Sequence, residues 1–63
     1  MEYFRTVNGH TEKWELKVVD LAAQVIHDMD LLKQIGRDVE AERLSSSSFV
    51  LTVDTKVSIV YTL

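Results

Sequence analysis

Polar and apolar residues alternate from residue 12 to residue 18, and this period of two predicts a strand. The Asn8-Gly9 pair just before it is the preferred centre of a two-residue type I′ turn, because both positions need a positive φ. These features predict a hairpin over residues 2–18, with strands at 2–7 and 12–18. The competing interpretation is a helix that starts at Glu12 with Thr11 as its cap. The hairpin register places four pairs on one face: Val7 with His10, Arg5 with Glu12, Tyr3 with Trp14, and Met1 with Leu16.

The period changes to 3.6 residues over 20–35, which predicts an amphipathic helix with one broad apolar face. Asp20 is suited to be its N-cap. Gly36 leaves two alternatives open. In the first alternative, Gly36 ends the helix as a C′ glycine, and Asp38 then caps a short second helix over 38–44. Otherwise the helix continues to residue 44, because Val39 falls on the same apolar face.

The C-terminal part of the chain contains a second pair of alternating segments. Ser45–Ser48 is the only low-complexity stretch and is typical of a flexible linker. Residues 49–63 are expected to form a hairpin with a three-residue loop at 54–56, since that loop pairs apolar with apolar positions: Val53 with Val57, Leu51 with Ile59, and Phe49 with Tyr61. We therefore predict a single α+β domain over 1–63, of ββαββ order. Its four-stranded, mainly antiparallel sheet is covered on one face by one helix.

Composition limits the classes of function. The chain has 63 residues and no Cys, which excludes disulfides and thiolate metal sites. Its net charge is −3, and residues 20–44 carry all of it, with six acidic and three basic residues. An acidic balance disfavours nucleic-acid backbones and anionic membranes. No apolar run is long enough to cross a bilayer and no basic, apolar leader precedes the first strand, so we expect a soluble, cytoplasmic protein.

Residues with catalytic or metal-binding potential are few. His27, Asp30 and Gln34 lie on the polar side of the helix at a spacing that could hold a metal weakly, but a solvated helix face explains them better. One helix over one small sheet offers little concavity for paired carboxylates to act as acid and base. We therefore expect no enzymatic activity, no cofactor and no metal.

Surface residues give the most specific functional hypothesis. Three apolar residues fall on the outer sheet face, and a patch forms if the strand order brings them together. Four acidic residues of the central segment are further candidates for contact with a basic partner. The partner-binding candidates are thus Phe4, Val50 and Val60, together with Asp28, Asp30, Asp38 and Glu40.

These observations favour a small interaction or regulatory protein that acts through protein–protein contacts. A homodimer is expected, since residues 57–63 contain no charge and would pair with a copy if they formed an exposed edge. A larger protein with a basic surface is a further partner. The alternative is a nucleic-acid-binding module that uses Phe4, Lys13 and Lys17 of the first hairpin, although Glu2 and Glu15 on the same face cancel their charge. A metal-binding protein or enzyme comes third.

Overall fold

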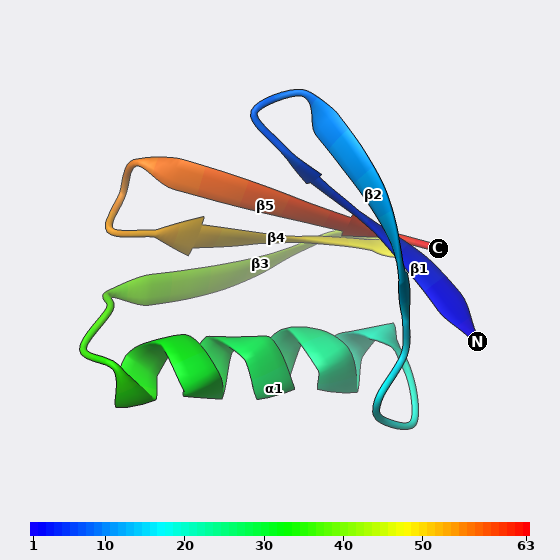
Figure 1. The fold of residues 1–63 in the computed structure, drawn as a ribbon, viewed down its shortest axis with the longest axis horizontal. Coiled ribbons are helices and arrows are strands. Elements are labelled where there is room, and N and C mark those ends of the chain that lie inside the picture. The colour runs from blue at the N-terminus through cyan, green and yellow to red at the C-terminus, as the bar shows by residue number, and fades with distance from the viewer.

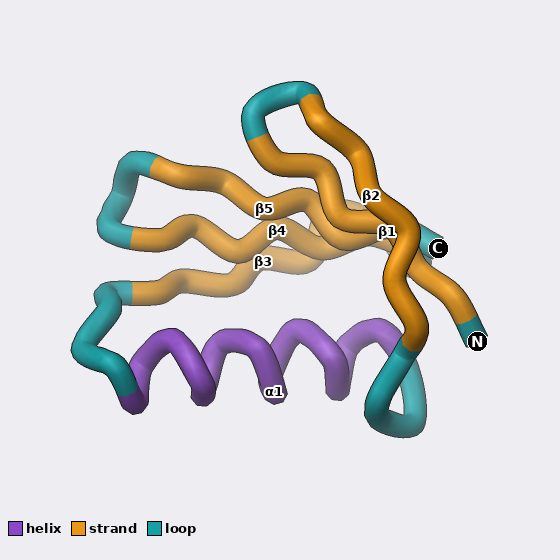
Figure 2. The backbone as a smooth tube through the Cα atoms, in the orientation of Figure 1, coloured by secondary structure: helices purple, strands orange, loops and turns teal.

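A computed structural model describes all 63 residues, which form one antiparallel sheet with one helix against it (Figure 1 and Figure 2). The strand order is β2-β1-β5-β4-β3. The helix α1 lies over β3, β4 and β5, while the β1–β2 hairpin twists away from it. The elements are β1 (Glu2–Val7), β2 (His10–Glu15), α1 (Leu21–Gln34), β3 (Val39–Ser45), β4 (Ser48–Val53) and β5 (Val57–Thr62).

The first hairpin forms as its turn residues predict. Asn8 and Gly9 have φ values of 52° and 76°, as a type I′ turn requires. The predicted register is confirmed, including the pair of Tyr3 with Trp14. The strand predicted over 12–18 is wrong at its end, because β2 stops at Glu15. Beyond that point the backbone leaves the sheet, and the Lys17 N–H donates to the side chain of Gln24 in α1 at 2.9 Å.

The helix begins and ends at residues suited to those roles. The Asp20 carboxylate accepts a hydrogen bond from the Ala23 N–H at 2.9 Å, which caps the N-terminus. At the other end Gly36 has a φ of 87°, and its N–H donates to the Lys33 carbonyl at 3.0 Å. The Arg37 N–H donates to the Leu32 carbonyl at 3.0 Å, which completes a Schellman motif. The helix predicted at 20–35 is confirmed, and its continuation to residue 44 is wrong.

The segment after the helix is a strand, so the short helix predicted at 38–44 is wrong. β3 pairs with β4 and turns Val39 and Ala41 towards the helix, opposite Val53 and Leu51. Burial of Val39 and the pairing of β3 with β4 outweigh the helix preference of the intervening glutamates. The serines are not a linker either, since Ser45 and Ser48 pair across a tight turn. The sheet therefore has five strands in ββαβββ order, where the sequence predicted four.

The second predicted hairpin is confirmed as β4–β5, with Val53 opposite Val57 and Phe49 opposite Tyr61. Its loop differs from the expected geometry, because Asp54 and Thr55 adopt the positive φ values of 53° and 55°. β5 also pairs with β1 and so lies in the centre of the sheet. The uncharged residues of β5 are therefore not an exposed edge, and the argument for a homodimer through that edge is lost.

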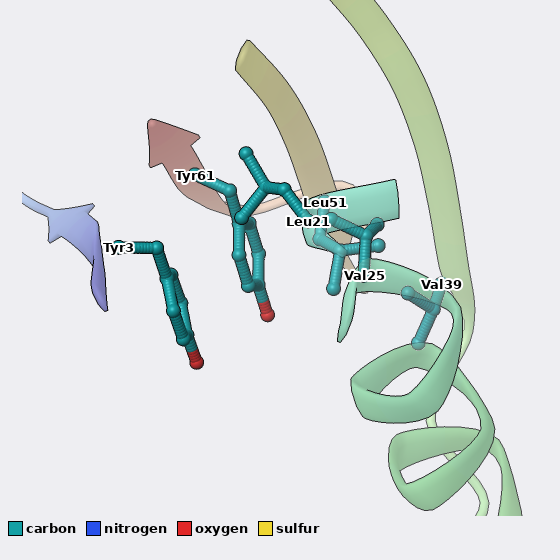
Figure 3. Packing of buried hydrophobic residues seen from close by; sticks show 6 residues of the cluster. All are labelled: Tyr3, Leu21, Val25, Val39, Leu51 and Tyr61. Atoms are coloured by element: carbon teal, nitrogen blue, oxygen red, sulfur yellow. The ribbon is translucent and has the colours of Figure 1, made fainter. Parts of the chain in front are cut away.

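The core lies between α1 and the inner face of the sheet. The Tyr3 and Tyr61 rings stack with centroids 5.7 Å apart, and their hydroxyls point to the same side (Figure 3). Gln24 is the one buried polar residue. No helix in the structure has the length and apolar character that crossing a membrane requires. The buried apolar residues are Tyr3, Leu21, Val25, Val39, Leu51 and Tyr61.

Candidate functional site

The outer face of the sheet, which the helix leaves uncovered, contains an apolar patch. Val50 and Val60 are direct register partners on β4 and β5. Phe4 on β1 lies diagonally next to Val60, because Thr6 opposes Val60 and Phe4 opposes Thr62. We call Phe4, Val50 and Val60 the outer patch. Phe4 is 38% exposed and the two valines are half-buried. The strand order thus brings together the three apolar residues that the sequence analysis singled out.

Charged residues surround the outer patch only at the two edge regions of the sheet. Four glutamates and one lysine occupy these positions, and the terminal amino group lies beside one of the glutamates, so this face has an excess of negative charge. On the β2 side the negative charges are paired: Lys13 Nζ lies 3.7 Å from Glu2, and the terminal amino group lies 3.6 Å from Glu15. On the β3 side Glu40 and Glu42 have no cation within ion-pair distance. The unbalanced negative charge therefore lies along β3.

The four acidic candidates do not form one surface. Asp30 is exposed on α1, Asp38 lies in the loop before β3, and Glu40 stands on the outer face of β3. Asp28 is on the inner side of the helix, where its side chain is only 15% exposed. Glu40 lies beside β4, the strand that carries Val50 of the outer patch, and Asp38 lies two residues before Glu40. Asp28 and Asp30 lie on the helix, away from both.

Asp28 is the centre of a polar cluster between α1 and the sheet. The Tyr61 hydroxyl donates to its Oδ2 at 2.6 Å, and Gln24 Nε2 donates to its Oδ1 at 3.0 Å. His27 Nδ1 lies 3.1 Å from Oδ1, and an Arg5 nitrogen lies 3.7 Å from Oδ2. Sequence reasoning missed this cluster, since its members come from three elements. The available indication was that Asp28 falls near the edge of the helix's apolar arc.

The surroundings of Asp28 also fix the state of two tyrosines. Burial raises the pKa of Tyr61 well above its ordinary value, and the hydrogen bond to Asp28 and the carboxylate charge raise it further. Burial, followed by the Asp28 charge, raises the pKa of Tyr3. Both phenols therefore stay protonated near neutral pH.

A shallow groove borders the cluster on the side of the β1–β2 hairpin. One part, with a volume of about 230 Å³, is lined by Leu31, Ile59 and the Asp28 cluster. The Arg5 guanidinium lies over the Trp14 ring, 3.8 Å from its centroid, which holds the cation in place. The only side-chain hydrogen bond of His27 is with Asp28. This arrangement orients charge and stabilises the fold, and it presents no nucleophile hydrogen-bonded to His27.

Other chemical candidates are not assembled by the fold. Lys13 lies on the outer face, whereas Lys17 lines the groove between the hairpin and α1, so the predicted placement of the two lysines on one face is wrong. No three His, Cys, Asp or Glu side chains lie close enough together to hold a metal ion. Comparisons with protein-family models, curated proteins and solved structures find no match to this chain.

Proposed function

We propose that this protein is a protein–protein interaction module that binds a basic surface of a larger protein through the outer face of its sheet. The observation that carries the proposal is the combination of an apolar centre, the outer patch, with a rim whose unpaired charges are the carboxylates of Glu40 and Glu42. Protein interfaces commonly have an apolar centre and a polar rim. Charge of one sign on the rim speeds association with a partner of the opposite sign.

The size of the face favours a transient complex. Five strands about 4.8 Å apart and six residues long at about 3.3 Å each give a footprint of roughly 480 Å². A standard stable interface buries about 800 Å² per partner. A face of this projected size is at the small end of the range for protein interfaces, where transient contacts are common.

The same charges bear on the choice between a second copy and a different partner. A face-to-face homodimer would bring together two surfaces that each have Glu40 and Glu42 unpaired, and such repulsion opposes association. The same negative charges attract a basic partner, whereas they repel a second copy of this chain. The expected homodimer stays a prediction, to be tested by light scattering over a range of protein concentrations.

The proposal is tested with two matched variants in affinity capture from the source cell. Phe4 and Val57 are each 38% exposed, on opposite faces of the sheet. Phe4→Thr removes an aromatic ring, Val57→Thr exchanges one methyl group for a hydroxyl at a site of equal exposure, and neither changes the charge. The captured protein is then purified and its Kd measured for each variant at several salt concentrations.

We expect Phe4→Thr to raise Kd roughly thirtyfold, because truncating an aromatic anchor costs about 2 kcal/mol. Val57→Thr should leave Kd within a factor of about two, and binding should weaken as salt rises. Equal loss for both variants, or a captured protein whose binding does not depend on Phe4, would show that the outer patch is not the binding surface.

A further inference from the structure

β3 is an edge strand, so half of its backbone N–H and C=O groups face away from β4 without a strand partner. Such an edge can accept an added strand from another chain. The other edge of the sheet, β2, is less suited, because it carries charges of both signs and two of its charged residues are already paired: Lys13 with Glu2, and Glu15 with the terminal amino group. The question is therefore what kind of chain β3 fits.

An apolar groove runs beside β3 on the helix side of the sheet. One part has a volume of about 200 Å³ and lies between α1 and β3, with Ile26 and Ala22 on the helix side and Ala41 and Phe49 on the sheet side. Ile26 is 55% exposed there. Arg43 extends along the groove with its guanidinium 5.8 Å from the Phe49 ring. A side chain that points inward from a strand added to β3 would meet this apolar surface.

The opposite side of β3 is acidic. Glu40 and Glu42 point to the outer face and have no ion-pair partner. The nearest basic residue before the strand, Arg37, is bound to Asp54 at 2.9 Å. An added strand would therefore place its outward side chains next to two free carboxylates.

A second copy of β3 fits this edge poorly. In a two-fold antiparallel pairing only residues of the same face oppose each other. In a register centred on Ala41, Glu40 lies opposite Glu42 of the copy. In a register centred on Glu42 or on Arg43, the central residue lies opposite the same residue of the copy, so two like charges meet. Directly opposed like charges destabilise a strand pair. The charge pattern thus disfavours self-pairing and leaves a basic strand as the fitting occupant.

We propose that β3 binds an extended segment of another protein as a sixth strand, in which basic residues alternate with apolar ones. The basic side chains lie beside Glu40 and Glu42, and the apolar side chains enter the groove next to Ile26. This contact shares Glu40 and Glu42 with the rim of the outer patch, but it does not involve Phe4 and Val60, which lie on strands that β3 does not touch.

The test is an NMR titration of the ¹⁵N-labelled protein with the peptide acetyl-Lys-Val-Lys-Val-Lys-amide. We expect saturable shifts centred on the amides of 39–43 and on Ile26. The acidic counterpart, acetyl-Glu-Val-Glu-Val-Glu-amide, should not bind. A fully N-methylated form of the basic peptide should not bind either, because it keeps the charges and loses the donors that pair with the strand edge.

Variants separate strand addition from general attraction to an acidic surface. Glu40→Gln and Glu42→Gln should each weaken binding about 1.5- to 5-fold, the range measured for cross-strand charge pairs. Ile26 and Leu31 are 55% and 51% exposed on opposite flanks of α1, so Ile26→Lys and Leu31→Lys add the same charge at matched sites. Leu31→Lys should weaken binding only through its added charge. Ile26→Lys should weaken binding several-fold more than Leu31→Lys does, because it also removes the apolar contact.

Three results would overturn the proposal: equal binding of the N-methylated peptide, equal effects of the two lysine variants, or shifts spread over the acidic surface without a maximum at β3. Shifts confined to Phe4 and Val60 would also overturn it, while leaving the outer patch as the binding surface. Conversely, Phe4→Thr should not alter peptide binding at β3, so each proposal can fail independently of the other.

Discussion

Removing the Tyr61 hydroxyl tests the polar cluster around Asp28 with the least disturbance of packing. Tyr61→Phe keeps the ring that stacks on Tyr3 and deletes only the 2.6 Å hydrogen bond to the carboxylate. A hydrogen bond to a charged group contributes about 1.5–3 kcal/mol. Asp28 keeps the amide of Gln24 as a donor and is 15% exposed to water, so we expect a loss near the lower half of that range, about 2 kcal/mol.

This loss is a large share of the stability of so small a domain. At about 0.05–0.15 kcal/mol per residue, a chain of this length has roughly 3–9 kcal/mol in total. The melting temperature should fall by about 8–16 °C, since each kcal/mol shifts it by about 4–8 °C in domains of this size. Chemical denaturation followed by circular dichroism measures the free energy of unfolding directly.

Tyr3→Phe is the matched control. Tyr3 is buried in the same stack, but its hydroxyl makes no hydrogen bond within the protein. Its removal should change the free energy of unfolding by less than about 0.5 kcal/mol. If the two variants lose equal stability, the loss comes from removing a hydroxyl from the stacked ring pair in general. The Tyr61–Asp28 hydrogen bond then contributes no stability of its own.

The pH dependence gives a second test of the same bond. The pKa of Tyr61 is raised above the ordinary 10.0 of the unfolded chain, mainly by burial and then by the bond to Asp28. The stability from this group is therefore complete below pH 10 and is lost as the pH rises above 10 towards the folded-state pKa. Tyr61→Phe lacks that loss, so its deficit should shrink by about 1.4 kcal/mol between about pH 8 and about pH 11. A deficit that grows over this interval would contradict the assignment.

Three substitutions test the local structure, each by denaturant unfolding. Thr55→Asn should stabilise the protein by about 0.5–1 kcal/mol, because Thr55 is β-branched at a φ of 55° and Asn tolerates that region; unchanged or lower stability would contradict this. Gly36→Ala should cost roughly 1 kcal/mol for its φ of 87° alone, since nothing lies within 4 Å of an added Cβ; a neutral result would mean that the helix does not end there as described. Gln24→Ala should cost about 1–3 kcal/mol, as it leaves the Lys17 N–H without its acceptor and removes the amide donor to Asp28 Oδ1; a loss below about 0.5 kcal/mol would argue against both bonds.

The parts of the fold that were predictable are those that local chemistry decides. Asn8-Gly9 determines the first turn and hence the register of β1 and β2. Asp20 and Gly36 mark the ends of α1 through capping. The register of β4 and β5 follows from matching apolar positions across a short loop.

β3 escaped prediction because its local preferences point the other way. Its residues Val39–Leu44 include Glu, Ala, Arg and Leu, which favour helices, and Val39 also fits the apolar face of a longer helix. What makes it a strand is tertiary: Val39 becomes buried opposite Val53, and the backbone pairs with β4. The alternation of Val39-Glu40-Ala41-Glu42 was the available indication in the sequence.

The candidate surfaces divide in the same way. The residues of the outer patch could be named from alternation, but their contiguity depends on the strand order, which places β5 between β1 and β4. The partner of Asp28 could not be named, since Tyr61 lies 33 residues away in sequence. That Glu40 and Glu42 stand on a free edge follows only from the unpredicted strand β3 and its place at the edge of the sheet.

Both proposed surfaces rest on the pairing of residues 39–45 with β4, and NMR tests that pairing most directly. We expect cross-strand nuclear Overhauser effects between the segment 40–42 and the segment 50–52, with the β5 amides exchanging slowest with solvent. Consecutive amide–amide contacts through 38–44, as in a helix, would contradict the five-stranded sheet, and with it the free edge and the acidic rim of the outer patch.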